Sequence, residues 1–485
     1  YYRVLYKGNY SEVFRKEEVR IIGSALDDRT CRNCFAYLRT IASAVGLRVD
    51  GRNVLAGRYE KIDFIREDSI LASFLGKKEL PACEKKDGTI VYSFGFNESQ
   101  RTAIDNALQN PLSIIEGPPG TGKTQTILNI IANAVMRGES VAVVSSNNSA
   151  TANVYEKLRR YGVGFIAAPL GNADNKEAII ENQTSQLPDM SSWKTDPRDA
   201  ELPERLRELD VKLKLKNELS SLYAEKDALE KEKAHFDDYY ATLDTSALKK
   251  PHIPTDKLLL FSAEYEYLMS SGKKIGWITK IRIALTYGLL ACRLLGRPVE
   301  QVTAYRQHLF YRKRLSEIAA RCKKIEKELS AFDFDLRMRE YADISMMRLR
   351  SALANTYRGK ARRIYESDDL WRMPEIFQKD YPVILSTTYS LRSSLSSRTC
   401  YNYVIVDEAS QVDLVTGALA LSCAEKAVIV GDLKQLPNVV NGEQKKLTDD
   451  IFARFVLPPA YRYSDHSLLS TVTELFPDAP RVLLR

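Results

Sequence analysis

The chain has 485 residues, 44% of them hydrophobic and 28% charged, which is typical of a soluble globular protein with two to four domains. The net charge of +8 is compatible with a polyanionic partner but is no evidence for one. Seven cysteines spread over a long chain argue against a disulfide framework and predict an intracellular, reducing location, cytoplasmic or nucleoid-associated. We expect no signal peptide and no membrane span, because the most apolar stretch, 275–295, contains Lys280 and Arg282.

Residues 1–93 predict an N-terminal accessory lobe of mixed structure. We expect strands at 2–7 and 18–22, a helix at about 31–45 and a short helix at 69–75. Cys31 and Cys34 have no second cysteine pair at zinc-site spacing, so we expect them to be small buried side chains at the start of a helix. The first residue is Tyr1 rather than Met, which we interpret as the sign of a fragment.

Residues 94–174 change to an alternation of strands and helices. Apolar strands are predicted at 112–115, 140–145 and 163–168, and the helices between them at 125–136 and 153–161. This alternation indicates a parallel sheet. It stops near 175 and returns in 381–485, where apolar strands begin at Tyr381, Tyr403 and Ala427 and each ends in polar residues.

The intervening residues 175–380 predict a helical insertion. Apolar side chains recur at helical spacing in two sets, which we expect to fold back as an antiparallel coiled-coil arm; an ordinary bundle core is the alternative. The first set is Leu206, Leu209, Leu213, Leu219, Leu222, Leu229 and Phe236, and the second is Leu315, Ile318, Cys322, Ile325, Leu329, Phe332 and Leu336. Between them, lysines and arginines alternate with Trp277 and Tyr287, either as a nucleic-acid-contacting tip or as a solvated surface.

The run Gly117-Pro-Pro-Gly-Thr-Gly-Lys-Thr124 matches the phosphate-binding loop G-x-x-x-x-G-K-[ST], between a strand and a helix as that motif requires. Its backbone N–H groups and the start of the following helix suit an anion. Lys123 is expected to reach the β- and γ-phosphates and Thr124 to hold Mg²⁺. We expect ATP to be bound by Gly117, Gly120, Thr121, Gly122, Lys123, Thr124 and Gln125.

Other polar residues follow strands or precede the loop. Asp407 is expected to hold the metal through water and Glu408 to orient or deprotonate the attacking water, which favours hydrolysis over passive binding. Gln435 is placed to sense the γ-phosphate or the lytic water, and the amide of Gln100 has the donor and acceptor needed to read an adenine edge.

The order of these elements resembles the superfamily 1 helicases, 1B-like, in the branch that contains the nonsense-mediated-decay RNA helicase and senataxin. The resemblance rests on Phe96-Asn-Glu-Ser-Gln100, the phosphate loop, Asp407-Glu-Ala-Ser-Gln411 and Gly431-Asp-Leu-Lys-Gln-Leu-Pro437. It covers 94–170 and 380–485 well and 1–93 loosely. It implies a RecA-like P-loop NTPase domain, in two parts (94–174 and 381–485), with a helical coiled-coil insertion and the N-terminal lobe.

Carried over by position, the resemblance implies that Gln100 contacts adenine and that Gln435 couples the γ-phosphate to the nucleic-acid path. Ser146, Asn148 and Thr387 would contact the single strand, although Ser146 and Asn147 depart from the family's usual Pro-Ser-Asn. The implied partner is single-stranded nucleic acid, with DNA slightly favoured over RNA, and the arm offers a surface for a protein partner.

Two further expectations concern the limits of the resemblance. The insertion looks larger than the family's, and its role could be strand separation, partner docking or spacing. The chain stops near the point where a second motor domain would open, so we expect only the first motor domain here, and weak ATP hydrolysis by this chain alone.

Two other functions stay open on the residues. One is a non-motor ATP-dependent switch whose arm docks a protein partner. The other is a hexameric ring ATPase, against which the Gly-Asp-x-x-Gln-Leu-Pro element argues.

Overall fold

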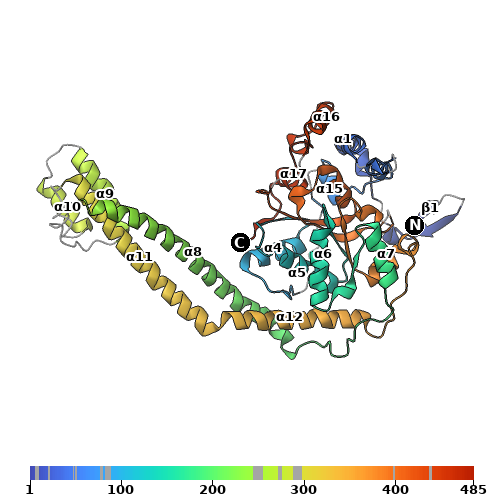
Figure 1. Cartoon of the computed structure of the whole chain (residues 1–485), viewed down its shortest axis with the longest axis horizontal. Coiled ribbons are helices and arrows are strands. Elements are labelled where there is room, and N and C mark those ends of the chain that lie inside the picture. Colours follow the sequence, from blue (N-terminus) through green and yellow to red (C-terminus); the bar gives the residue numbers. More distant parts are fainter. Residues whose placement is uncertain are drawn as a thin grey trace. The chain divides into compact units, whose positions relative to one another are not determined.

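The computed structural model describes the whole chain apart from residues 6–9, 20–21, 47, 50–51, 77–79, 82–88, 244–254, 271–275, 288–297, 397–398 and 436–439. The chain forms two compact units (Figure 1). We call Tyr1–Arg205 together with Arg339–Arg485 the core unit, and Leu206–Met338 the helical unit. The division into four domains that the sequence predicts is not tested by this division into two units and stays a prediction.

A seven-stranded sheet lies at the centre of the core unit, in the order β11-β5-β10-β9-β6-β8-β7, and every neighbouring pair is parallel. This confirms the predicted α/β class. The strands are β5 (Leu112–Glu116), β6 (Val141–Ser145), β7 (Ala167–Pro169), β8 (Val383–Thr387), β9 (Tyr401–Val406), β10 (Ala424–Gly431) and β11 (Arg481–Leu483). The side chains of β5 and β6 are buried along their whole length, which explains their unbroken apolar runs.

Helices cover both faces of the sheet (Figure 1). One face carries α4 (Glu98–Gln109), α5 (Lys123–Met136) and α6 (Asn148–Arg160); the other carries α3 (Ile70–Phe74), α15 (Leu414–Leu421) and α17 (Leu468–Leu475). This unit also contains α7 (Ala173–Asn182), α13 (Asp369–Arg372), α14 (Pro374–Asp380) and α16 (Gly442–Phe452). The layering is the one expected when strands and helices alternate.

The N-terminal segment shares its hydrophobic core with the sheet domain. Helices α1 (Arg29–Val45) and α2 (Val54–Glu60) join the cluster that contains α15 and α17. The hydroxyl of Tyr37 donates to the carbonyl of Tyr461 at 2.9 Å, and that of Tyr59 donates to the carbonyl of Val415 at 2.7 Å. Cys31 and Cys34 are fully buried in α1, as predicted.

The first residues differ from the predicted pattern. A hairpin forms from β1 (Tyr2–Leu5) and β2 (Ser11–Phe14), and β3 (Arg48–Val49) pairs with β4 (Arg52–Asn53). The predicted strand at 18–22 is wrong at Glu18, which ends a short 3₁₀ turn because its carboxylate accepts the backbone N–H of Arg15 at 2.8 Å. Residues 20–21 of that prediction lie outside the described residues.

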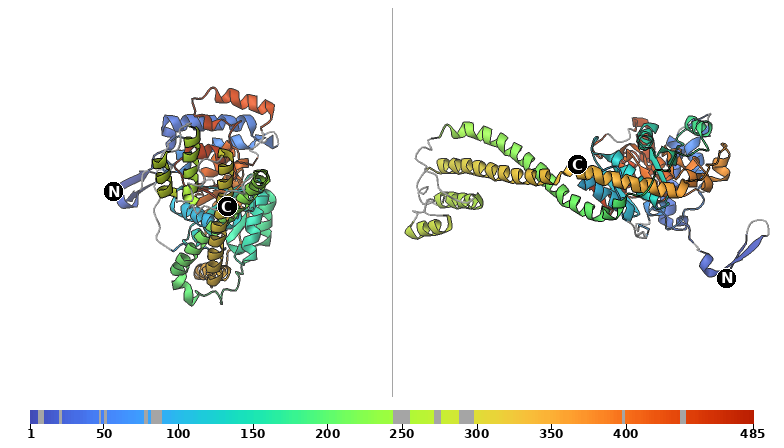
Figure 2. Two further views of the ribbon diagram at one scale, coloured as in Figure 1. Left: turned by 90° about the vertical axis from the view of Figure 1, so that its left-hand side faces the viewer. Right: turned by 90° about the horizontal axis from the view of Figure 1, so that it is seen from below.

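Long helices dominate the helical unit, and α8 (Leu202–Tyr240) and α11 (Val299–Phe332) run antiparallel, side by side (Figures 1 and 2). The chain enters through α8, continues through α9 (Thr255–Ser270), α10 (Trp277–Tyr287) and α11, and leaves through α12 (Phe334–Tyr357). Three ion pairs link α8 to α11 at 2.6–2.7 Å: Glu225 with Arg314, Glu218 with Arg321, and Lys212 with Glu328.

The second apolar set lies partly between these helices. Ile318, Cys322 and Ile325 are buried, whereas Leu336 is 48% exposed. The repeat breaks there because α11 ends at Phe332 and Asp333 takes a left-handed conformation (φ 50°). A coiled coil in the strict sense stays a prediction.

The basic segment between the two apolar sets is only partly described. Trp277 is 72% exposed and Tyr287 is buried, whereas Lys249, Lys250, Lys273, Lys274, Arg293 and Arg297 lie outside the described residues. No helix in the described part of the chain is long and apolar enough to cross a membrane.

Candidate active site

The phosphate-binding loop lies between β5 and α5, as predicted. Gly120 and Gly122 both have φ +87°, a conformation that L side chains rarely adopt. A Cβ atom on Gly122 would lie 1.9 Å from Nε2 of Gln100, whereas one on Gly120 would meet no atom within 4 Å. One glycine is therefore required by close packing, and the other borders open space that an anion can approach.

The start of α5 faces the same space. Lys123 is the first residue of the helix and Gly122 caps it without a side chain, so the first N–H groups have no side-chain acceptor from the cap. Such a helix start attracts negative charge. Thr124 follows in the first turn, and its hydroxyl lies 3.5 Å from the amide of Asn153 on α6.

The carboxylates after β9 meet the loop lysine. The Nζ of Lys123 lies 3.3 Å from Oε1 of Glu408, and both side chains are largely shielded from solvent. Glu408 has φ +52°, which turns the chain sharply after the strand. The structure thus brings Lys123 next to the adjacent carboxylates Asp407 and Glu408, which lie far from it in the sequence.

Asp407 is held in a low-polarity position. Burial raises the pKa of its carboxyl to about 6, and the neighbouring charge of Glu408 adds to the rise; Lys123 and the backbone N–H of Glu408 oppose it. That N–H donates to Oδ1 of Asp407 at 2.9 Å. A buried carboxylate with little compensating charge is a favourable place for a divalent cation.

Two buried polar atoms at this site make no hydrogen bond within the described residues: Nζ of Lys123, whose contact with Glu408 is an ion pair only, and Oε2 of Glu408. Buried polar groups are normally paired, so these atoms fit a site that a ligand completes. ATP with Mg²⁺ fits the donor set, because Lys123 and the loop N–H groups suit phosphate oxygens and the oxygens of Thr124 and Asp407 suit Mg²⁺.

Gln100 is placed beside the loop, but its amide is occupied. Its Oε1 accepts the backbone N–H of Asn97 at 2.9 Å, and its Nε2 donates to the carbonyl of Thr121 at 3.1 Å and to Oε1 of Gln125 at 3.3 Å. The side chain of Gln125 in turn donates to the carbonyl of Phe94. The predicted adenine contact would require Gln100 to exchange these partners, which now hold the loop against α4.

Gln435 follows β10, which lies between β5 and β9 in the sheet. The backbone N–H of Gly117 donates to the carbonyl of Gly431 at 3.0 Å. The first residue of the phosphate loop is therefore bonded to the residue that ends β10, four positions before Gln435. The N–H of Gln435 donates to the carbonyl of Asp432 at 3.1 Å. Leu436 and Pro437 lie outside the described residues.

The three predicted nucleic-acid contacts lie at the carboxyl edge of β6 and β8. Ser145, which precedes Ser146, pairs with Thr387, and the N–H of Thr388 donates to the carbonyl of Ser145 at 3.0 Å. Ser146 is exposed, whereas Oδ1 of Asn148 is buried against Gly171. Exposure thus favours Ser146 over Asn148 as a strand contact.

Some residues at this edge were not predicted. Asn153 approaches Thr124, and Arg481 on β11 pairs with Glu116 at the end of β5. The sequence pattern that could have predicted β11 is weak. The strand has only three residues, and the first and last of them, Arg481 and Leu483, are exposed.

Comparison with known proteins agrees with this geometry. The family model described as "AAA domain" matches residues 95–443, more than half of the chain. "Regulator of nonsense transcripts 1 homolog" of Drosophila melanogaster is 40% identical over 84 residues, 17% of this chain and 7% of that protein. "DNA polymerase alpha-associated DNA helicase A" of Schizosaccharomyces pombe is 30% identical over 118 residues, 22% of this chain and 18% of that protein.

"DNA-binding protein SMUBP-2" of Rattus norvegicus is 40% identical over 84 residues, 17% of this chain and 8% of that protein. The matches to these three relatives thus cover less than a fifth of each relative's length. Taken with the parallel sheet and the site at its carboxyl edge, the match over 95–443 shows that the chain belongs to the AAA domain family, in its superfamily 1 helicase branch.

Proposed function

We propose that the chain is the ATP-hydrolysing part of a helicase or translocase that moves on single-stranded nucleic acid. The observation that supports this most is the 3.3 Å approach of Lys123 to Glu408 beside a buried Asp407. A phosphate-binding lysine adjacent to two carboxylates is the arrangement that hydrolysis needs, because one carboxylate can serve the metal and the other the attacking water.

Bound ATP with Mg²⁺ supplies the phosphoanhydride bond and the positive charge that balances its oxygens. Lys123 exchanges Glu408 for phosphate oxygens when the site fills, which frees the Glu408 carboxylate to accept a proton from water. Thr124 and Asp407 would hold Mg²⁺, whose charge would offset that of the phosphate oxygens. Gln435 acts at the γ-phosphate end, and Gln100 acts through the loop that it holds or, after exchanging partners, on adenine.

For the strand, we propose contacts from Ser146, Asn148 and Thr387 at the carboxyl edge of β6 and β8. DNA is slightly favoured over RNA, and the relatives' names include both a regulator of nonsense transcripts and a DNA helicase. We further propose an intracellular, reducing location and a protein partner for the helical unit.

The test is nucleotide turnover by the full-length protein with and without single-stranded DNA and RNA. We expect strand-stimulated turnover, and we expect Glu408→Gln to lower turnover by roughly 10²–10⁴-fold, the usual contribution of a general base, while nucleotide binding survives. Glu443→Gln on exposed α16 is the control and should leave turnover unchanged.

The same measurement separates the motor from its rival. ATP hydrolysis that no strand stimulates, together with nucleotide-dependent binding of a protein to the helical unit, would favour the switch. Glu408→Gln turnover equal to that of the unmodified protein would show that the carboxylate is misassigned.

A further inference from the structure

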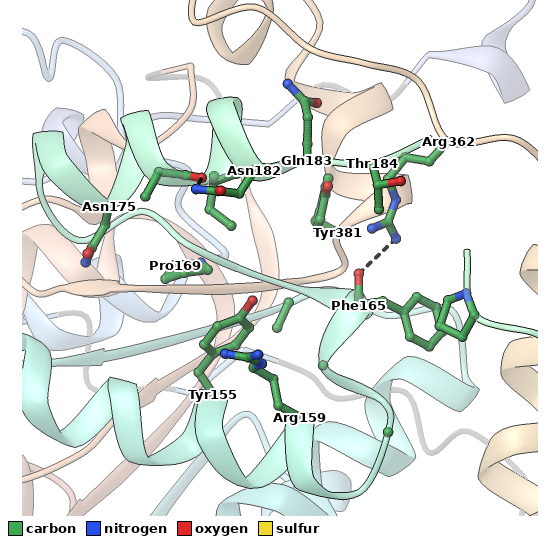
Figure 3. A pocket seen from close by; sticks show the side chains of 16 residues that line it. Tyr155, Arg159, Phe165, Pro169, Asn175, Asn182, Gln183, Thr184, Arg362 and Tyr381 are labelled. Carbon is green, nitrogen blue, oxygen red and sulfur yellow. Dashed lines mark hydrogen bonds between the residues drawn. The ribbon is translucent and has the colours of Figure 1, made fainter. Parts of the chain in front are cut away.

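A cavity lies at the β7 edge of the sheet, and its lining shares no residue with the phosphate loop (Figure 3). Its volume is about 670 Å³, within the range of ligand sites. It is lined by Tyr155 and Arg159 of α6, by Phe165 and β7, and by Asn175 of α7. Other lining residues come from the chain before the helical unit, such as Thr184, and from the chain after it, such as Arg362.

The charge of this cavity is one-sided. Two arginines, Arg159 and Arg362, line it, and none of the lining side chains, all of which the structure describes, is acidic. Within the described residues, neither guanidinium has a carboxylate at ion-pair distance. The neighbouring Arg160, in contrast, pairs with Glu156 at 3.0 Å on the surface of α6.

Arg362 is the more deeply buried of the two arginines. Arg362 is 8% exposed, and its Nη2 donates to the carbonyl of Asp380 at 2.9 Å and, as Figure 3 shows, to that of Phe165 at 2.8 Å. Its Nε is buried and has no hydrogen-bond partner within the part of the chain that the structure describes, and the guanidinium lies 4.1 Å from the ring centroid of Tyr381. A buried guanidinium is costly unless an anion balances it, and carbonyl dipoles and a ring face balance it only in part.

The opposite wall offers a ring and neutral polar groups. The guanidinium of Arg159 lies 5.9 Å from the ring centroid of Tyr155, and both line the same space. Burial raises the pKa of the Tyr155 hydroxyl, so this group stays a neutral donor. Arginine forks match phosphate geometry. Tyr155 and Phe165 are half-buried and line the cavity, and the guanidinium of Arg362 lies 5.8 Å from the ring centroid of Phe165. Aromatic rings of this kind pack against other planar rings.

We propose that this cavity binds a phosphate monoester attached to a planar base, with the phosphate at Arg159 and Arg362 and the base against Tyr155 and Phe165. A free mononucleotide and the terminal phosphate of a nucleic-acid strand both have this chemistry. The site is separate from the ATP site, so it does not depend on the proposed hydrolysis.

The test is calorimetric titration with adenosine monophosphate, adenosine and inorganic phosphate. The chain should carry Lys123→Ala, so that the phosphate loop contributes little. We expect saturable binding of the monophosphate, at least tenfold weaker binding of adenosine, and weaker binding of phosphate, which lacks a ring. Arg159→Gln should weaken binding of the monophosphate at least tenfold, and Arg160→Gln, the matched control one residue away, by less than twofold.

Arg362→Gln should also weaken binding, but this variant removes the bonds to Phe165 and Asp380, so its fold must be checked by thermal unfolding. Arg159 makes no such bonds, and the Arg159→Gln result stands if the Arg362 variant fails to fold. Equal binding of adenosine and its monophosphate, equal binding by Arg159→Gln, or no saturable binding would overturn the proposal.

Competition separates the two sources. If a 5′-phosphorylated oligonucleotide displaces the monophosphate and a 5′-hydroxyl oligonucleotide does not, the natural ligand is a strand end. If neither displaces it, the ligand is a free nucleotide. Displacement by the 5′-hydroxyl strand alone would contradict recognition of a terminal phosphate.

Discussion

Three charged side chains, Lys123, Asp407 and Glu408, meet at the proposed ATP site. Lys123 lies close to Glu408, and Asp407 is buried beside them with a raised pKa. The positive charge is therefore shared between two carboxylates, one of which is poorly solvated. We infer that part of the protein's folding stability is lost to keep this carboxylate ready for a cation.

Asp407→Asn tests this inference through the pH dependence of stability. The folded pKa of about 6 exceeds the ordinary value of 3.8, so the folded carboxyl keeps a proton that the unfolded chain loses. Stability should fall as pH rises from about 4 to about 6, by up to about 3 kcal/mol, since one pKa unit is worth about 1.4 kcal/mol.

Asn cannot ionise, so in metal-free buffer the variant should be the more stable protein at pH 8 and nearly equal at pH 4. Urea unfolding at several pH values measures this difference. Asp450→Asn, on exposed α16, serves as the control. A variant that is less stable than the unmodified protein at pH 8 would contradict the cost assigned to Asp407.

At the scale of elements, the turn between β5 and α5 depends on one close approach. Gly122→Ala puts a Cβ 1.9 Å from Nε2 of Gln100, on a backbone with φ +87°. Gln100 cannot move freely, because its amide is fully bonded. We expect a loss of at least about 1–2 kcal/mol, the usual left-handed penalty for a side chain, and weaker ATP binding.

Gly442→Ala is the matched control, because a Cβ there meets nothing within 4 Å and no positive φ is required. It should leave ATP binding unchanged and stability equal or slightly higher. Thermal unfolding and fluorescence titration with an ATP analogue measure both effects. Equal results for the two alanines would show that the turn tolerates a side chain.

The helical unit depends on the apolar side chains between α8 and α11 rather than on its surface ion pairs. Such exposed pairs contribute little, typically below about 1 kcal/mol each. Ile325 is fully buried, so Ile325→Ala should lower the local opening free energy by roughly 2–4 kcal/mol. Leu336→Ala, at a position that is 48% exposed, should change it by less than about 0.5 kcal/mol.

Hydrogen exchange of α11 amides measures that opening. If Leu336→Ala destabilises α11 as much as Ile325→Ala does, the uninterrupted apolar repeat in the sequence describes the packing better than the observed break at Asp333.

At the scale of the whole molecule, the core unit is continuous in space although the helical unit interrupts it in sequence. The side chains of Arg205 and Glu340, at the two ends of the interruption, form an ion pair at 3.3 Å. A flexible Gly/Ser linker of about eight residues, with a reach of about 15 Å, can therefore replace Leu206–Met338.

We expect this deletion to keep ATP binding, because Lys123, Asp407 and Glu408 all belong to the core unit. A nucleotide-dependent thermal shift measures it, and the same deletion with Lys123→Ala should show no shift. A folded deletion variant without a shift would mean that the ATP site needs the helical unit.

The amino-acid sequence by itself determined the class of the protein and most of its strands. Apolar runs that end in polar residues predicted β5, β6, β8, β9 and β10 close to their observed bounds, because strands buried on both faces allow few other residues. The loop Gly117–Thr124 was equally clear, since only glycine suits its close approaches and left-handed turns. The fully buried Cys31 and Cys34 also followed from the pattern.

Only the tertiary structure decided which of these residues meet. Local patterns contain no information on strand order, and it is the order β5-β10-β9 that brings Glu408 to Lys123. The same holds for the amide network around Gln100, for the N-terminal helices that share the core of α15, and for the two arginines of the β7 cavity. Each depends on side chains from distant segments, whose contacts are set by packing and not by neighbours in sequence.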